Sequence, residues 1–279
     1  MTGWIIGSLI LFFLAAVYFF AIMPSFGRRE ECMELAGWNY AHRGLWNEEE
    51  KIPENSLPAF ARAVRDGYAI ELDVQLTRDR ELVVFHDDTL LRMCGAEGRI
   101  RDYTLEELSS FHLQNTCCKI PAFREVLEVV DGKVPLLVEL KMPDKNPMVC
   151  AVLNRELIHY TGLYCIESFN SLALRWYREN MPDILRGQLS GRFSARDGQH
   201  AIVRMMATQL MFNFVGRPDF IAYDYRYATC PGFVINHALF KTPTFAWTVR
   251  SHLTCRRIRG KFDAIIFERF FPGRDKKEC

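Results

Sequence analysis

The chain has 279 residues, of which 49% are hydrophobic and 25% charged, so it is long enough for one large domain and an appendage. A net charge of +1 and the lack of a dense basic run argue against a nucleic-acid partner. The nine cysteines are odd in number and form no Cys-x-x-Cys pair, which indicates reduced thiols rather than a disulfide framework or a zinc site.

Residues 3–26 carry no charged side chain and are almost wholly apolar. About 20 helical residues rise roughly 30 Å, the thickness of a bilayer core, so we expect a transmembrane helix followed by a short polar linker at residues 27–37. A cleavable signal peptide has a basic start and a small-residue cleavage site, and neither is clear here. Because Arg28 and Arg29 follow the apolar run and no basic residue precedes it, the positive-inside rule predicts a single-pass membrane protein with the remaining chain in the cytoplasm.

Strand-like and helix-like stretches alternate after the linker. Helical patterns are expected at residues 56–66, from 104 onward, and at 123–130, 146–159, 171–180 and 199–214. Nine stretches are expected as strands, at residues 38–42, 69–76, 82–86, 135–141, 164–169, 184–189, 220–225, 244–249 and 263–268.

This alternation predicts an α/β fold with a parallel sheet, and the length suits a TIM-type (β/α)8 barrel over residues 38–272. Nine strands are one too many for that barrel. Residues 69–76 and 82–86 are separated by only five residues, too few for a crossover helix, so we expect a hairpin with one arm outside the eight. A charged tail, residues 273–279, follows.

Acidic residues occur inside two of the apolar strands. Alternation places Glu71 and Asp73 on one strand face, and Glu139 shares a face with Lys141. Carboxylates in such strands are costly unless paired or metal-bound, and the carboxyl ends of parallel barrel strands meet at one mouth. Converging carboxylates without a cysteine or histidine cluster favour Mg²⁺ or Ca²⁺; the alternative is a set of structural ion pairs with arginines.

Two histidines stand at strand ends. A lone histidine there is often structural, but His42 is followed by Arg43 and His86 by Asp87. Cleavage of a phosphodiester needs a base for the nucleophile and an acid for the leaving alkoxide. Arg43 and Lys141 are suited to neutralise the phosphate.

These motifs, in this order and spacing, resemble the glycerophosphodiester phosphodiesterase family over about residues 40–268. The resemblance rests on His42-Arg43-Gly44, Pro53-Glu54-Asn55, Glu71-Leu72-Asp73-Val74-Gln75-Leu76-Thr77, His86-Asp87 and Glu139-Leu140-Lys141. It implies a TIM barrel with a small insertion at residues 89–120 and a divalent metal on three carboxylates. The roles it implies are metal ligands for Glu71, Asp73 and Glu139, acid and base for His42 and His86, and phosphate binding for Arg43 and Lys141.

Three features are less defined. Trp247 matches an aromatic residue that lines the pocket in such enzymes, or it is barrel core. Glu54 is placed to reach metal or phosphate, whereas Asn55 is also a helix-capping residue. Phe267-Glu268 stands where the family more usually has Thr-Asp.

The resemblance implies a hydrolase of lipid and glycerol metabolism that releases sn-glycerol 3-phosphate and an alcohol from glycerophosphodiesters, and the apolar residues 3–26 indicate a membrane-anchored member. Alternatives are a lysophospholipase D or sphingomyelinase D-type activity at the same site, and a membrane-tethered binding module without turnover. Residues 205–214, rich in Met and Phe, are interpreted as packed helix or a lipid-contacting rim. Because the linker enters the barrel at its amino end, the mouth is expected to face away from the bilayer unless the barrel tips sideways.

Overall fold

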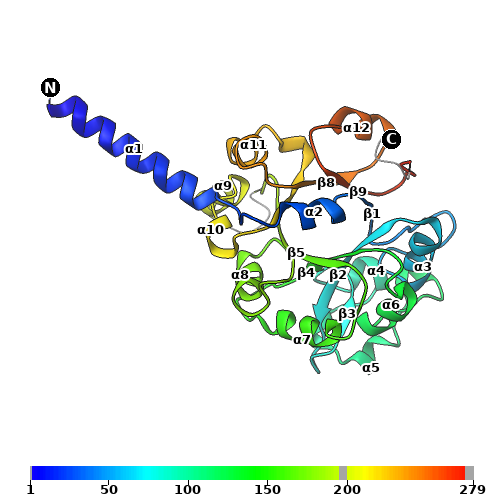
Figure 1. Ribbon diagram of the computed structural model, residues 1–279. Coiled ribbons are helices and arrows are strands. Elements are labelled where there is room, and N and C mark those ends of the chain that lie inside the picture. The colour runs from blue at the N-terminus through cyan, green and yellow to red at the C-terminus, as the bar shows by residue number, and fades with distance from the viewer. Residues whose placement is uncertain (1, 195–199, 274–279) are drawn as a thin grey trace.

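The central sheet is a closed barrel of eight parallel strands (Figure 1). The computed structural model describes residues 2–194 and 200–273. The barrel order is β1-β9-β8-β7-β6-β5-β4-β2, closed by pairing of β1 with β2, so the TIM-barrel prediction is confirmed. The strands are β1 (Asn39–His42), β2 (Ala69–Leu76), β4 (Leu136–Leu140), β5 (Tyr164–Ser168), β6 (Arg186–Ser190), β7 (Phe220–Asp224), β8 (Thr244–Val249) and β9 (Ala264–Phe267).

The predicted hairpin is also present. Strand β3 (Leu82–Val84) pairs antiparallel with β2 and lies outside the eight. It ends two residues earlier than expected, but the Phe85 N–H still donates to the Asp73 carbonyl at 2.9 Å. The segment leading to His86 is therefore tied to the strand that carries the acidic residues.

Helices surround the barrel. Ser56, rather than Asn55, caps α3 by accepting from the Ala59 N–H, and Thr104 forms a capping box with Glu107 at the start of the helix expected from residue 104. The larger surrounding helices are α3 (Leu57–Asp66), α6 (Phe123–Val130), α7 (Met148–Leu157), α8 (Ser171–Asn180), α9 (Ala201–Thr208), α11 (Pro231–Ala238) and α12 (His252–Ile258).

The single helix expected over residues 199–214 is wrong. Helix α9 ends at Thr208 and the short α10 (Asn213–Gly216) follows, because Leu210 adopts a left-handed φ of 60° that no α-helix continues through. Residue 199 and most of the expected tail, residues 274–279, lie outside the described residues.

Residues 89–120 form a small unit beside β3. It contains α4 (Leu91–Cys94), α5 (Leu105–Leu108) and the 3-10 turns η1 (Ile100–Asp102) and η2 (Leu113–Asn115). These pack around their own apolar cluster of Val83, Phe85, Leu90, Met93, Ile100, Leu108, Leu113 and Ile120.

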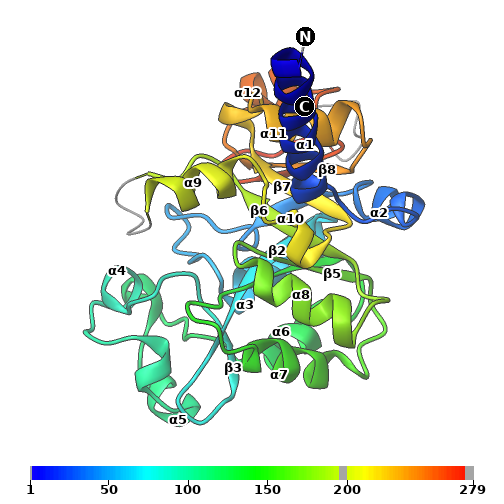
Figure 2. The same cartoon turned by 90° about the vertical axis from the view of Figure 1, so that its left-hand side faces the viewer.

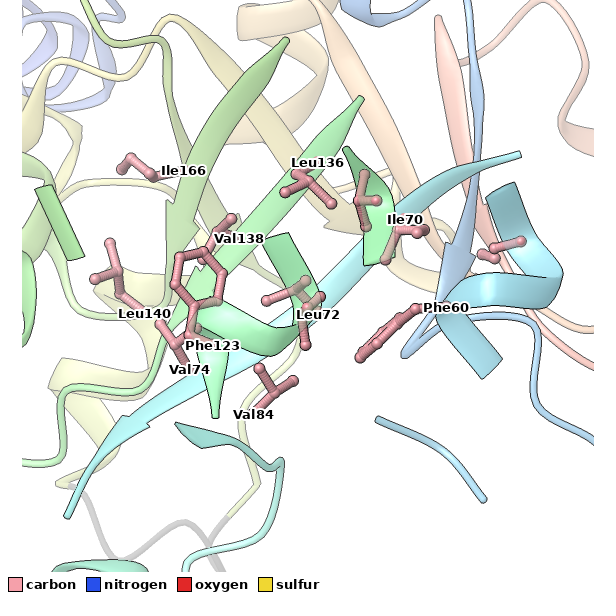
Figure 3. Packing of buried hydrophobic residues seen from close by; sticks show 14 of the residues in the cluster. Phe60, Ile70, Leu72, Val74, Val84, Phe123, Leu136, Val138, Leu140 and Ile166 are labelled. Carbon is pink, nitrogen blue, oxygen red and sulfur yellow. The ribbon is translucent and has the colours of Figure 1, made fainter. Parts of the chain in front are cut away.

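Side-chain alternation divides β2 and β4 between core and interior (Figure 3). Ile70, Leu72, Val74, Leu136, Val138 and Leu140 belong to the cluster that includes Phe60 of α3 and Phe123 of α6. The intervening residues must then point into the barrel. The apolar packing between sheet and helices therefore forces the acidic residues inward.

The segment 27–37 was expected as a polar linker, but it contains α2 (Arg29–Leu35). Cys32 and Leu35 of α2 are buried with Tyr40, Phe220 and Phe245. The segment is helical because its apolar residues are spaced to cover the amino end of the barrel. The helix α1 (Thr2–Ile22) precedes it, and Trp4–Ile22 is long and apolar enough to cross a membrane.

The cysteines only partly follow the expectation of reduced thiols. Among residues 2–194 and 200–273, seven are free: Cys32, Cys94, Cys117, Cys118, Cys150, Cys165 and Cys230. Cys255, in contrast, is disulfide-bonded.

Close packing at the amino end of the barrel depends on Gly187. A Cβ there would lie 2.1 Å from the Phe220 ring, which is itself stacked on Phe245 at 4.7 Å. We expect Gly187→Ala to lower the free energy of unfolding by about 1–3 kcal/mol in urea denaturation, because an overpacked ring has nowhere to move. Adding Phe220→Leu should recover part of that loss; equal stability of Gly187→Ala and wild type would contradict this packing.

Candidate active site

Three buried carboxylates meet inside the carboxyl half of the barrel. Asp73 on β2 is in register with Glu139 on β4, and Glu71 precedes Asp73 by two residues on the same strand face. One oxygen from each lies within 4.8 Å of the others. Neighbouring parallel strands with identical alternation are the reason that these three side chains converge.

Two cations and an amide contact these acids. The Lys141 Nζ lies 2.6 Å from Glu139 Oε1 and 2.9 Å from Asp73 Oδ1. Asn55 donates from Nδ2 to Asp73 Oδ2 at 2.8 Å. Arg43, in a left-handed conformation with φ 60°, donates its backbone N–H to Glu71 Oε2 at 2.9 Å. Asn55 therefore donates a hydrogen bond to the acid cluster, while Ser56 caps the helix α3.

The cluster holds more negative charge than its cations compensate. Burial, together with the neighbouring carboxylates, raises the pKa of Glu71 well above its usual value and raises that of Glu139 despite Lys141. Burial would also raise the pKa of Asp73, but Lys141, His86 and Arg43 hold it well below its usual range.

A fourth acid, Glu167 on β5, is in register with Glu139. Burial and the charge of Glu71 raise its pKa well above the usual value. Its Oε2 is buried and has no hydrogen-bond partner among the described residues. Four buried carboxylates against Arg43 and Lys141, with an unbonded oxygen beside them, fit a divalent cation with oxygen ligands.

The two predicted histidines are each held by a carboxylate at Nδ1. His42 Nδ1 lies 2.6 Å from Glu268 Oε2, and His86 Nδ1 lies 2.7 Å from Asp87 Oδ1. This arrangement orients each ring and leaves its Nε2 as the nitrogen for exchanging a proton with a ligand. The His42 Nε2 points toward the acid cluster, 4.0 Å from Glu71 Oε2.

The electrostatics of the two histidine pairs are set by burial and hydrogen bonding. Burial lowers the pKa of His42 by more than its bond to Glu268 raises it, so the ring is neutral at neutral pH. Burial alone would raise the pKa of Glu268, but His42 and Arg250 lower it to about 2. Burial alone would raise the pKa of Asp87, but hydrogen bonds from His86 and Arg92 outweigh this effect and hold the pKa well below its usual range.

The backbone on either side of His86 is held by a side chain of β2. Gln75 donates from Nε2 to the carbonyls of Phe85 and Asp87, both at 2.8 Å. Glu54 lies outside the three-carboxylate cluster, where Arg43 and Arg92 bind it at 2.7 and 2.6 Å. Glu54 is thus positioned beside the phosphate-binding candidate Arg43.

A cavity of about 420 Å³ opens beside these groups. It is lined by residues from the strand ends and from the 89–120 unit, among them His86, Glu139, Lys141, Phe169, Arg99 and Arg101. Trp247 packs edge-on against Phe169, with ring centroids 5.7 Å apart. A larger cavity of about 920 Å³ beside α5 and α6 contains none of the predicted site residues, so size alone does not locate the site.

Several site residues were not selected from the sequence. Asp87 was noted only as a neighbour of His86, and Glu268 only as a departure from a family pattern. The position of Glu268 follows from barrel closure, because β9 pairs with β1 and their ends meet. Glu167 stands inside an apolar predicted strand as Glu71 and Glu139 do, so the same pattern could have indicated it, whereas no local pattern indicates Arg92, Arg99 or Arg101.

The fold and the acid cluster define a (β/α)8-barrel protein with a candidate metal site at its carboxyl end. Residues 42–270 match the Glycerophosphoryl diester phosphodiesterase family. The chain belongs to this family.

Curated relatives and solved structures agree with this assignment. A glycerophosphodiester phosphodiesterase of Bacillus altitudinis is 32% identical over 157 residues, 52% of this chain and 63% of that protein. One from Caldanaerobacter subterraneus is 35% identical over 163 residues, 53% of this chain and 65% of the relative. These alignments span just under two thirds of the relatives' lengths. A phosphodiesterase of Oleispira antarctica, solved with the product sn-glycerol-3-phosphate, shares the fold at 23% identity with a TM-score of 0.66, covering 82% of this chain and 92% of that one.

The Glu268 carboxylate should make stability depend on pH. Its pKa is about 2 when folded and about 4.5 when unfolded, so the unfolded chain binds more protons between these values and stability falls as the pH drops. We expect the excess stability of wild type over Glu268→Gln to shrink by roughly 1–2 kcal/mol from about pH 6 to about pH 3.5 in urea unfolding. A pH-independent difference would show that His42 and Arg250 do not lower the pKa of Glu268 in the folded protein.

Proposed function

We propose that this protein hydrolyses a glycerophosphodiester to sn-glycerol 3-phosphate and an alcohol. One observation carries the proposal: two histidines, each bound at Nδ1 by a carboxylate, flank a buried cluster of three acids at the barrel mouth. Membership of the family and the names of the relatives support it.

Glu71, Asp73 and Glu139 would hold one divalent cation, Mg²⁺ or Ca²⁺. Such an ion, when bound, draws charge from a phosphoryl oxygen. Arg43 and Lys141, the cations nearest to the acids, bind the phosphate, and Arg43 is braced for this by Glu54. Trp247 supports Phe169 at the edge of the substrate cavity.

The histidines divide the proton transfers. His42, neutral because it is buried, accepts the proton of the attacking water or of the neighbouring glycerol hydroxyl at Nε2. His86 donates a proton to the departing alkoxide, and the Asp87 carboxylate holds its ring at Nδ1. Glu268 holds the His42 ring in the orientation that presents Nε2.

A second candidate is cleavage of a lysolipid at the same site, which the long apolar helix α1 favours. In this view residues 3–26 anchor the protein in a membrane and the barrel lies in the cytoplasm, as the pair Arg28 and Arg29 indicates.

The cytoplasmic location of the barrel can be tested by labelling. An impermeant maleimide should label the exposed Cys117 only after cells are permeabilised. Labelling of intact cells would reverse this topology.

Loss of either histidine should abolish most turnover. We expect His42→Ala and His86→Ala each to lower kcat by roughly 10²–10⁴-fold, because each removes one proton transfer. The measurement is release of sn-glycerol 3-phosphate from glycerophosphoethanolamine, run beside lysophosphatidylethanolamine. His159→Ala, an exposed histidine past the end of α7, is the matched control and should retain wild-type rates. No turnover of any such diester by wild type would leave the binding-module alternative.

Removal of the metal should stop the reaction without unfolding the barrel. We expect EDTA to abolish turnover and either Mg²⁺ or Ca²⁺ to restore it, with the preferred ion giving the higher rate. Glu139→Gln should weaken the ion's affinity, measured by calorimetry, whereas Glu106→Gln on exposed α5 should not. Full activity in EDTA would contradict a metal role for the cluster.

A further inference from the structure

The end of α1 is bound to the flank of the barrel. Buried Asn213 and Asn236 both donate from Nδ2 to the Ile22 carbonyl, at 2.9 and 3.1 Å. Arg217 donates to the carbonyls of Phe20 and Met23 at 3.1 and 2.8 Å. These donors satisfy carbonyls that the last turn of a helix leaves unpaired, so the direction of α1 relative to the barrel is fixed.

Aromatic contacts place α1 against α10 and the end of α11. Phe20 packs on Phe214 of α10, with centroids 6.4 Å apart. Phe240, just past α11, contacts both Phe19 and Phe26 at 6.3 and 5.9 Å. Figures 1 and 2 show α1 leaving the molecule beside α9, α10 and α11. The helix therefore leaves from the side of the barrel, which favours the alternative in which the barrel tips sideways.

Helix α9 carries an apolar side that the barrel does not cover. No residue of α9 is buried, and Ile202 is 69% exposed. Ile202 lies on the same helical face as Met206 and Gln209, at spacings of four and seven residues. Gln209 Oε1 accepts from the hydroxyl of Tyr18 on α1 at 3.0 Å. The uncovered side of α9 therefore faces the direction in which α1 leaves.

Aromatic and basic side chains lie between α9 and the barrel mouth. A cavity of about 360 Å³ is lined by Phe193 after β6, Met205 of α9 and Tyr227 after β7, together with Arg192 and Arg204. Phe193 contacts Phe169 at 6.0 Å between ring centroids, and Phe169 lines the cavity that holds His86 and Lys141. The contact between Phe193 and Phe169 thus joins the lining of the cavity beside α9 to the lining of the candidate active site.

We propose that this flank is a bilayer-contacting surface. Its exposed apolar residues are Ile202 and Met205 of α9, Phe214 of α10, Leu239 after α11 and Phe26 after α1. The occupant is a phospholipid bilayer, because the surface is continuous with α1, whose 21 residues rise about 30 Å and match the hydrocarbon core. The barrel then lies on its side, with the mouth at the membrane interface and the rings of Phe193 and Phe169 placed to contact an acyl chain. This proposal rests on the proposed function and selects a lipid-borne diester as its substrate class.

Photo-cross-linking of the full-length protein in phosphatidylcholine–phosphatidylglycerol vesicles tests the surface without requiring turnover. The photoreactive residue p-benzoylphenylalanine replaces Ile202 or, as a matched control, Ile158 past the end of α7; both are 69% exposed. Phe12, 74% exposed on α1, is the reference position within the membrane. We expect lipid adducts at positions 202 and 12 and none at position 158.

Adducts at 12 but not at 202 would overturn the surface, as would equal adducts at 202 and 158 or cross-links from 202 to a second copy of the chain. Absence of adducts at both 12 and 202 would overturn the membrane location itself. In parallel, Ile202→Ser should slow hydrolysis of lysophosphatidylcholine in vesicles several-fold and leave that of soluble glycerophosphocholine unchanged, with Ile158→Ser affecting neither. Failure of hydrolysis on both substrates would refute the proposed function alone, since the cross-links report position independently.

Discussion

The structure depends on the burial of like-charged carboxylates inside the barrel. Leu72 and Val138 must face the surrounding helices, so alternation sends Glu71, Asp73 and Glu139 into a shared interior space. The cost of that burial explains the groups around them. Lys141 and Arg43 supply charge, Asn55 supplies a hydrogen bond, and the pKa values of Glu71 and Glu139 remain raised. Because the buried carboxylates outnumber the neighbouring cations, the site favours the binding of a metal cation.

Closure of the barrel adds the second element of the site. Because β9 pairs with β1, the carboxylate of Glu268 reaches the imidazole of His42, although the two residues are 226 positions apart. His86 obtains its carboxylate from the next residue, and Gln75 binds the backbone carbonyls of Phe85 and Asp87 on either side. The two histidines are therefore oriented in the same manner, His42 by a residue distant in the sequence and His86 by its sequence neighbour.

The flank that receives α1 is the part of the barrel that we propose to lie against a membrane. The carbonyls at the end of α1 accept hydrogen bonds from Asn213, Asn236 and Arg217, so α1 is joined to the barrel by direct contacts. The segment expected to be that tether is instead α2, which covers the amino end of the barrel. A fixed angle between helix and barrel makes the orientation of the mouth a property of the fold.

The sequence by itself determined the local features of this protein. The alternation of apolar and acidic residues defined the strands, the hairpin and the inward face, because those patterns arise from neighbours along the chain. It also determined the apolar length of α1 and the residues that match the family. Only the tertiary structure decided the partners of those residues: Glu268 for His42, Asn55 for Asp73, and the flank rather than the amino end of the barrel for α1. Contacts between residues far apart in the chain depend on how the sheet closes, and no local periodicity contains that information.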